Sequence, residues 1–316
     1  MELITSRAVI GAYYARLDAG ANIPWINGVS NLFNSDQDSE TYAWLGMTPA
    51  MREWVGGRNA KGFKESSVII RNRHYEATLE VALRDIRRDK SAQIMARVND
   101  LADRAQTHWG SLLSTLIVAG ESAVCYDGEY YFDTDHKEGA NQSSQSNDLS
   151  IDISALPAAV HGITTAPSVE EMQQCILQAI AAIQSFKDDQ GEPMNESASE
   201  FVVIVPTSLY LTTLSAITNA TLTSGAFNIL PNVPGLRISV QMNARLNASW
   251  TAQFAVFRTD GAVKGLIRQQ ETEGELKAKA EGSEYEFDND AWQFGIDSWR
   301  NVGYGYWQQA CLVTMT

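Results

Sequence analysis

The sequence contains little of what marks disulfide-stabilised or membrane-spanning proteins. Its three cysteines, Cys125, Cys175 and Cys311, lie far apart and form no CxxC pair. An odd, widely spaced set argues against a disulfide framework and fits a reducing cytoplasm. No apolar run approaches the roughly 20 residues that a membrane span needs. The first 18 residues lack the basic-then-apolar pattern of a signal peptide. These absences predict a soluble, cytosolic protein without a membrane.

Positive charge is also scarce. The formal net charge is -14, and no run of Lys or Arg interrupts the acidic balance. Such a surface repels a polyphosphate backbone. Hydrophobic residues make up 44% and charged residues 20% of the chain, as in an ordinary folded protein. If nucleic acid is a partner, the composition favours a protein that encloses the nucleic acid over one that binds it tightly.

Recognisable catalytic motifs are missing as well: there is no P-loop, no GxSxG and no HExxH. One short cluster, Asp133, Asp135 and His136, combines two carboxylates with an imidazole and could hold a divalent metal. The competing interpretation is a polar loop in which the Asp side chains accept hydrogen bonds from nearby backbone N–H groups. One cluster cannot complete a coordination shell. We therefore expect no enzyme, no cofactor and no metal.

The strongest local pattern predicts a long helix. Apolar residues recur at steps of three and four from Ile94 to Leu116, and the pattern ends at Gly120. Starting near Ser91, this helix would be about 43 Å long. Just before it, residues 75–84 alternate between apolar and polar, which predicts a strand. Residues 67–70 are its expected hairpin partner, with a turn near Asn72.

Shorter elements follow. A first helix is expected to end at Gly20, and residues 125–132 indicate a strand or hairpin around an Asp-Gly turn. Ser168 and Glu171 form a capping box that starts another helix. Further strands are expected at residues 201–205, 236–240, 254–258, 263–267 and 311–315, with a short helix at 207–217. Helices and strands mix without regular alternation, which predicts an α+β fold.

Two N-terminal stretches are rich in aromatic residues but irregular. Residues 21–39 carry Trp25 and Phe33 among Pro, Gly and Asn, and such a segment needs a surface to lie on. That surface could belong to a neighbouring subunit. Residues 42–58 are dense in Trp, Gly and Arg.

The resemblance to a known family rests on three motifs: YAWLGMTPAMREWVGGR at 42–58, CYDG with YFDTDH at 125–136, and RNVGYGYWQ at 300–308. Together they resemble the Mu-like phage major head protein family of the gpT type, in order along nearly the whole chain. That family is similar to the Hong Kong 97-type capsid fold. The resemblance implies an N-terminal arm (1–62), an extended β-loop (63–88), a peripheral domain with a long spine helix (89–149), an axial domain (150–245) and a return to the peripheral domain (246–316).

The resemblance further implies a major capsid protein that self-assembles into hexamers and pentamers of an icosahedral tailed-phage shell around double-stranded DNA. Its place would be the virion, after assembly in the host bacterial cytoplasm. Its partners would be copies of itself, with portal, scaffold and decoration proteins. The alternatives are a nanocompartment shell of the same fold and a metal-dependent hydrolase that uses Asp133, Asp135 and His136.

Contacts between subunits are expected from the arm and the β-loop, which have no obvious place on a solitary chain. Deletion of residues 1–39 should then leave a soluble protein that cannot close shells. The alternative for residues 42–58 is that they fix the fold of the arm within one chain. The candidate interface residues are Trp25, Phe33, Trp44, Arg52, Glu53, Trp54 and Arg58.

Overall fold

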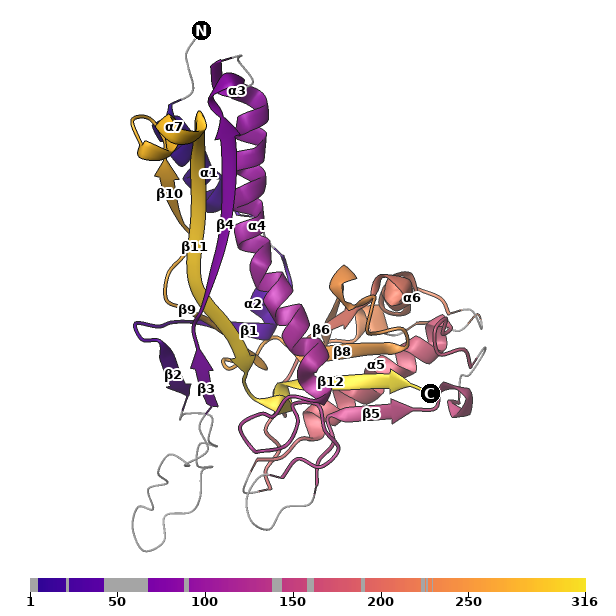
Figure 1. Cartoon of the computed structure of the whole chain (residues 1–316). Coiled ribbons are helices and arrows are strands. Elements are labelled where there is room, and N and C mark those ends of the chain that lie inside the picture. Colours follow the sequence, from indigo (N-terminus) through magenta and orange to yellow (C-terminus); the bar gives the residue numbers. More distant parts are fainter. Residues whose placement is uncertain are drawn as a thin grey trace, which may run out of the picture.

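The computed structural model describes residues 5–20, 23–42, 68–87, 91–137, 144–157, 162–188, 191–222, 225, 227–228 and 230–316. An elongated unit of long strands lies beside the helix α4, and a second, more compact unit lies at the other end of that helix (Figure 1). The mixture of helices and strands in both units confirms the predicted α+β class. In the described part of the chain, no helix is both long and apolar enough to cross a membrane.

The elongated unit is built on a five-stranded sheet. Its strands follow the order β1-β9-β11-β10, and β4 pairs with β11 along its whole length. Helices α1 and α4 pack on the sheet, with Tyr13, Val98 and Phe294 in their shared core. The elements are α1 (Ser6–Ala19), α2 (Ile26–Val29), β1 (Ser30–Asn34), β4 (Arg73–Ala82), α3 (Leu83–Arg87), α4 (Ser91–Val118), β9 (Leu266–Gln270), β10 (Glu275–Lys279), α7 (Glu284–Asn289) and β11 (Ala291–Tyr304).

The compact unit holds a second five-stranded sheet in the order β5-β12-β8-β6-β7. Helix α5 begins at the predicted capping box of Ser168 and Glu171 and buries its apolar face in the core of this unit. The elements are β5 (Asp148–Ile151), α5 (Val169–Ser185), β6 (Glu200–Val205), α6 (Thr207–Thr218), β7 (Arg237–Met242), β8 (Gln253–Arg258) and β12 (Ala310–Met315), with short 3-10 turns η1 (Ala119–Glu121), η2 (Ile153–Ala155), η3 (Leu230–Asn232), η4 (Ala244–Leu246) and η5 (Trp307–Gln309).

The pairing of this second sheet corrects one expectation. Residues 246–316 were expected to return to the elongated unit as one block, but β8 and β12 pair within the second sheet. Of the strands within residues 246–316, β9, β10 and β11 belong to the first sheet. The physical reason is burial: Phe254, Val256 and Leu312 are fully buried in the core of the compact unit. The C-terminal third of the chain therefore contributes to both units.

The expected hairpin between residues 67–70 and the following strand is also wrong. Strand β3 (Val68–Arg71) pairs with β2 (Ser39–Tyr42), whereas β4 pairs with β11. Between β3 and β4 lies Asn72, buried to 6% exposure, whose amide nitrogen donates to the carbonyl of Gln37 at 2.8 Å. This hydrogen bond fixes Asn72 at the point where the chain passes from the two-stranded sheet of β3 to the five-stranded sheet of β4. Of the predicted extended β-loop, β4 thus belongs to the five-stranded sheet of the elongated unit, whereas β3 lies with β2 in a separate two-stranded sheet (Figure 1).

The N-terminal arm differs from expectation in the same way. Tyr13 is fully buried and its hydroxyl donates to the carbonyl of Gly274 at 3.0 Å. Arg16 forms a two-fold ion pair with Asp103 of α4, with both N···O distances at 2.8 Å. Strand β1 pairs in parallel with β9. The idea that the arm needs a neighbouring subunit is therefore wrong for residues 5–20 and 23–42, which fold onto their own chain.

Candidate functional site

Five of the seven candidate interface residues lie outside the described residues. The structure therefore leaves Trp44, Arg52, Glu53, Trp54 and Arg58 as predictions from the sequence.

The other two candidates lie within the molecule. Trp25 is 4% exposed and belongs to the main hydrophobic core, so it cannot serve as an anchor for another subunit without unfolding this one. Phe33 is half-buried and packs against Tyr42, with ring centroids 5.5 Å apart. Trp25 is thus buried by its own chain, and Phe33 stays an interface candidate predicted from the sequence.

The three residues proposed for a metal do not come together. The carboxylate of Asp133 accepts hydrogen bonds from the backbone N–H groups of Thr134 at 2.6 Å and of Asp135 at 3.2 Å. Asp135 itself is exposed, and His136 is fully buried. The polar-loop interpretation therefore describes Asp133, and the set of Asp133, Asp135 and His136 is not a shared site.

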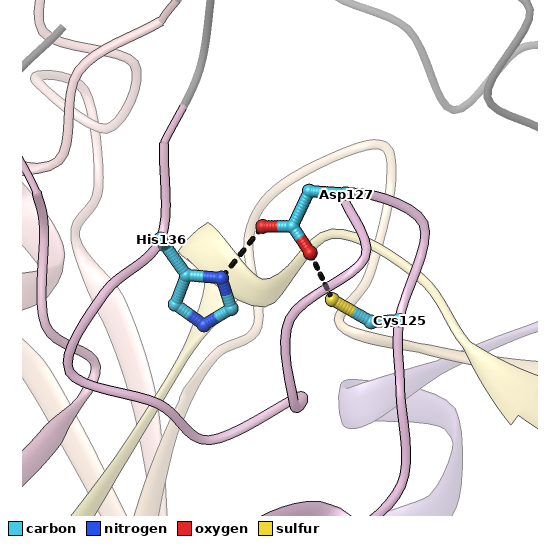
Figure 2. Close-up of side chains that lie close together, drawn as sticks. All are labelled: Cys125, Asp127 and His136. Atoms are coloured by element: carbon cyan, nitrogen blue, oxygen red, sulfur yellow. Dashed lines mark hydrogen bonds and ion pairs between the residues drawn. The ribbon is translucent and has the colours of Figure 1, made fainter.

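His136 instead joins a different carboxylate and a thiol, as Figure 2 shows. Its Nδ1 lies 2.6 Å from Oδ2 of Asp127, and the Cys125 thiol donates to the other carboxylate oxygen at 2.9 Å. A tight turn with Gly128 at φ 98° brings Cys125 and Asp127 together. Gly128 meets this positive φ at no steric cost. Sequence reasoning predicted the turn but missed that its Asp points at His136.

The far side of the His136 ring is also occupied. Its Nε2 lies 3.2 Å from Oδ1 of Asn147, whose amide nitrogen donates to the carbonyl of Tyr131 at 2.8 Å. The indole of Trp307 stacks on the ring at 4.0 Å between centroids and 7° between planes. Both ring nitrogens thus lie against side-chain oxygens. The cluster joins the loop after α4 to the turn before β12.

The three ligand-type atoms of Cys125, Asp127 and His136 lie within 4.8 Å of one another. A metal there would have to replace the hydrogen bonds that these three side chains make to one another. Burial also raises the pKa of the Cys125 thiol far above its usual range. Burial alone would raise the pKa of Asp127 too, but hydrogen bonds from His136 and Cys125 outweigh it and lower that pKa. The side chains of Cys125, Asp127 and His136 hydrogen-bond to one another inside the protein. We call this buried structural cluster the lock.

Replacement of Asp127 by Asn should lower the free energy of unfolding by about 2 kcal/mol, because a hydrogen bond to a charged group is lost inside the protein. The matched control is Asp135→Asn, which alters an exposed carboxylate on the same loop and should stay within about 0.5 kcal/mol. Urea denaturation of both variants measures the difference. Equal stabilities for the two variants would contradict the lock.

The same variant should respond differently to acid. Because the folded pKa of Asp127 lies below its ordinary value of about 3.9, its contribution is complete above that value. The contribution is then lost as the pH falls through the lower, folded pKa. Unfolding free energies measured between pH 7 and pH 3 should therefore fall less steeply for Asp127→Asn than for the unchanged chain. Parallel curves would show that folding does not lower the pKa of Asp127.

A family model described as the Mu-like prophage major head subunit gpT matches residues 9–156 and 233–316. Among similar curated proteins is the Mu-like prophage FluMu major head subunit of Haemophilus influenzae, 33% identical over 113 residues. That alignment covers 36% of this chain and 37% of the relative, so it spans well under half of the relative's length.

Solved capsids share the fold. The procapsid protein of bacteriophage JBD30 matches with a TM-score of 0.57 and 21% identity over 99% of this chain and 77% of its own. The virus-like particle of Pyrococcus furiosus matches with a TM-score of 0.52 and 9% identity over 97% of this chain and 98% of its own. These likenesses confirm the predicted phage-capsid fold. Since the family model covers well over half of the chain, the chain belongs to the Mu-like prophage major head subunits of the gpT type.

Proposed function

We propose that this chain is the shell-building subunit of a tailed-phage head, which self-assembles into hexamers and pentamers of an icosahedral capsid around double-stranded DNA. The observation that supports this most is the match to the major head subunit family on both sides of residues 157–232. The fold agrees, since it resembles assembled capsid proteins over nearly the whole chain. Assembly in the host bacterial cytoplasm, with portal, scaffold and decoration proteins as further partners, belongs to the same proposal.

The negative net charge of the chain is compatible with a shell that encloses DNA. A net charge of -14 repels the phosphate backbone of packaged DNA, so the shell encloses its cargo without holding it tightly. Catalysis is not part of the proposed role. In the most enzyme-like group, Cys125, Asp127 and His136 hydrogen-bond to one another, and burial raises the pKa of the thiol. The predicted absence of an enzymatic activity therefore stays as part of the proposal.

Electron microscopy of the purified full chain tests the proposal. Closed particles with an icosahedral outline are expected, and particles from infected or induced cells should protect DNA from nuclease. Closed particles that never contain DNA under those conditions would favour the nanocompartment alternative. A chain that forms no particles in either preparation would contradict both.

The sequence block at 42–58 supplies a further prediction about assembly. If Trp54 anchors a contact between subunits, Trp54→Ala should reduce the yield of closed particles at least tenfold, because buried aromatic anchors carry about 2 kcal/mol or more of binding energy. The folded subunit should keep its circular dichroism spectrum. A normal particle yield would favour the alternative in which this block only shapes its own chain.

A further inference from the structure

A cavity of about 410 Å³ opens beside the middle of α4. Its apolar wall includes Ile23, Leu32 and the indole of Trp109, and its polar wall includes Arg268 from β9 and Arg300 from β11. Leu32 is 46% exposed at this opening. The cavity therefore combines an accessible apolar surface with two guanidinium groups.

The positive charges of Arg268 and Arg300 are buried, and neither forms an ion pair among the described residues. Arg268 is 8% and Arg300 is 4% exposed, and both lie over the Trp109 ring, at 5.7 Å and 5.0 Å from its centroid. Among the described residues, no carboxylate comes within 4.0 Å of either guanidinium. Burial lowers the pKa of Arg268 to about 10. A buried cation without an anion is costly, so an anion from outside would be bound favourably.

The neutral partners of these arginines leave room for such an anion. Arg300 donates to the hydroxyl of Ser298 and a backbone carbonyl on α4, and Arg268 donates to Oδ1 of Asn27 at 2.8 Å. The Nε of Arg268 is buried and has no hydrogen-bond partner among the described residues. Glu273 lines the same cavity; it is exposed and forms no ion pair within 4.0 Å with any described residue, but its negative charge favours the charged form of Arg300. Arg268 thus lines the cavity with a guanidinium that has only neutral hydrogen-bond partners among the described residues.

The same chain carries a surface of complementary chemistry at α7. Phe287 is 90% exposed, the highest value among the large hydrophobic side chains described, and its neighbour Asp288 is exposed too. The short helix is held in place by the Ser283 cap and by the Tyr285 hydroxyl, which donates to a carboxylate of Glu80 at 2.6 Å. An ordered turn that presents an aromatic ring beside a free carboxylate is suited to an apolar pocket with buried arginines.

We propose that Phe287 and Asp288 of one copy dock into the cavity of Arg268, Trp109 and Arg300 on a neighbouring copy. The docking rests on the proposed assembly of the chain into shells. The α7 end lies at one extremity of the elongated unit, whereas α2 and β9 lie nearer its junction with the compact unit (Figure 1). Because the two surfaces occupy different places on one chain, the contact is head-to-tail and can repeat around a closed assembly.

Chemistry at the contact follows from these groups. The carboxylate of Asp288 would accept charge-assisted hydrogen bonds from terminal N–H groups of Arg268 and Arg300. The Phe287 ring would cover Leu32 and the indole edge. Each such contact can be weak, since every subunit in a shell is held at several points at once.

Photo-cross-linking within assembled particles tests this docking. The cross-linking amino acid p-benzoyl-phenylalanine replaces Phe287, and particles are first verified by electron microscopy, so a failure to assemble is separated from a failure to dock. Cross-links between copies should map to residues 23–32 or 105–109. The matched control places the same amino acid at Leu211, which is 73% exposed on α6 of the compact unit. Cross-links from position 287 that map elsewhere, or match the control, would overturn the proposal.

A reciprocal probe identifies the occupant of the cavity. With p-benzoyl-phenylalanine at Leu32, cross-links between copies should reach residues 284–289, and Asp288→Asn should reduce their yield several-fold in intact particles. Cross-links to residues 43–67 instead would show that another segment fills the cavity, and an unchanged yield in Asp288→Asn would remove the role of the carboxylate. Either result would refute the docking of α7.

Discussion

Deletion of residues 1–42 is expected to prevent folding of the elongated unit rather than to leave a soluble subunit that only fails to assemble. The deleted segment includes β1, which pairs with β9. It also buries six large side chains almost completely in the body of the chain: Val9, Tyr13, Trp25, Ile26, Val29 and Tyr42. At about 1.5–3 kcal/mol for each buried side chain, their loss costs on the order of 10 kcal/mol. That equals the whole stability of a typical domain.

Circular dichroism and urea denaturation of the truncated chain measure this effect. The matched control removes residues 1–4 only, which leaves the Thr5 cap of α1 in place. The control should unfold like the full chain, and the longer deletion should aggregate or lose its cooperative transition. A soluble, cooperatively folded product of the longer deletion would restore the original idea of an arm that depends on its neighbours.

Replacement of Trp307 by Ala is expected to lower the free energy of unfolding by about 4 kcal/mol, the range found when buried Trp or Phe is truncated. Trp307 is fully buried, stacks on His136, and packs edge-on against Phe186 at 5.1 Å. Its carbonyl also accepts a hydrogen bond from Asn147 at 3.4 Å. The indole thus supports both the lock around His136 and the core of the compact unit.

The matched control for this substitution is Trp299→Ala. Trp299 also stacks on a histidine, His74, but it is 36% exposed. Its removal should cost about 1 kcal/mol or less, because exposed side chains lose little transfer free energy. Urea denaturation of both variants gives the comparison. Equal losses for the two tryptophans would show that stacking, rather than burial, dominates at Trp307.

Much of the helical structure could be predicted from the sequence because its causes are local. The three-and-four spacing from Ile94 to Leu116 lies within α4, and the Ser168–Glu171 box starts α5 where expected. Both signals depend on neighbours within a few residues. Buried apolar strands such as β6 and β12 were likewise close to their predicted ranges.

Strand pairing could not be predicted in the same way. The longest strand, β11, was missed, although Trp292, Phe294 and Ile296 alternate along it, because polar residues interrupt its second half. The partner of β4 is this strand, more than 200 residues away in sequence, and not the adjacent β3. A local pattern indicates that a strand has one covered face. It does not say which distant segment covers it.

The lock around His136 shows a similar limit. The sequence placed Asp127 in a turn and His136 at the end of a polar loop, which the structure confirms. It could not tell which of Asp127, Asp133 and Asp135 would face the imidazole, because side-chain direction depends on the dihedral angles of the turn at Gly128. The carboxylate of Asp133 accepts a hydrogen bond from the backbone N–H of Thr134, and the carboxylate that contacts the His136 ring is that of Asp127.

Sedimentation velocity of the purified full chain, over a range of concentrations, tests most directly whether this chain builds a shell. The proposed function predicts that most of the protein sediments as closed particles, far ahead of a single 34.8 kDa chain. A chain that sediments at 34.8 kDa at every concentration, with or without scaffold, would contradict it.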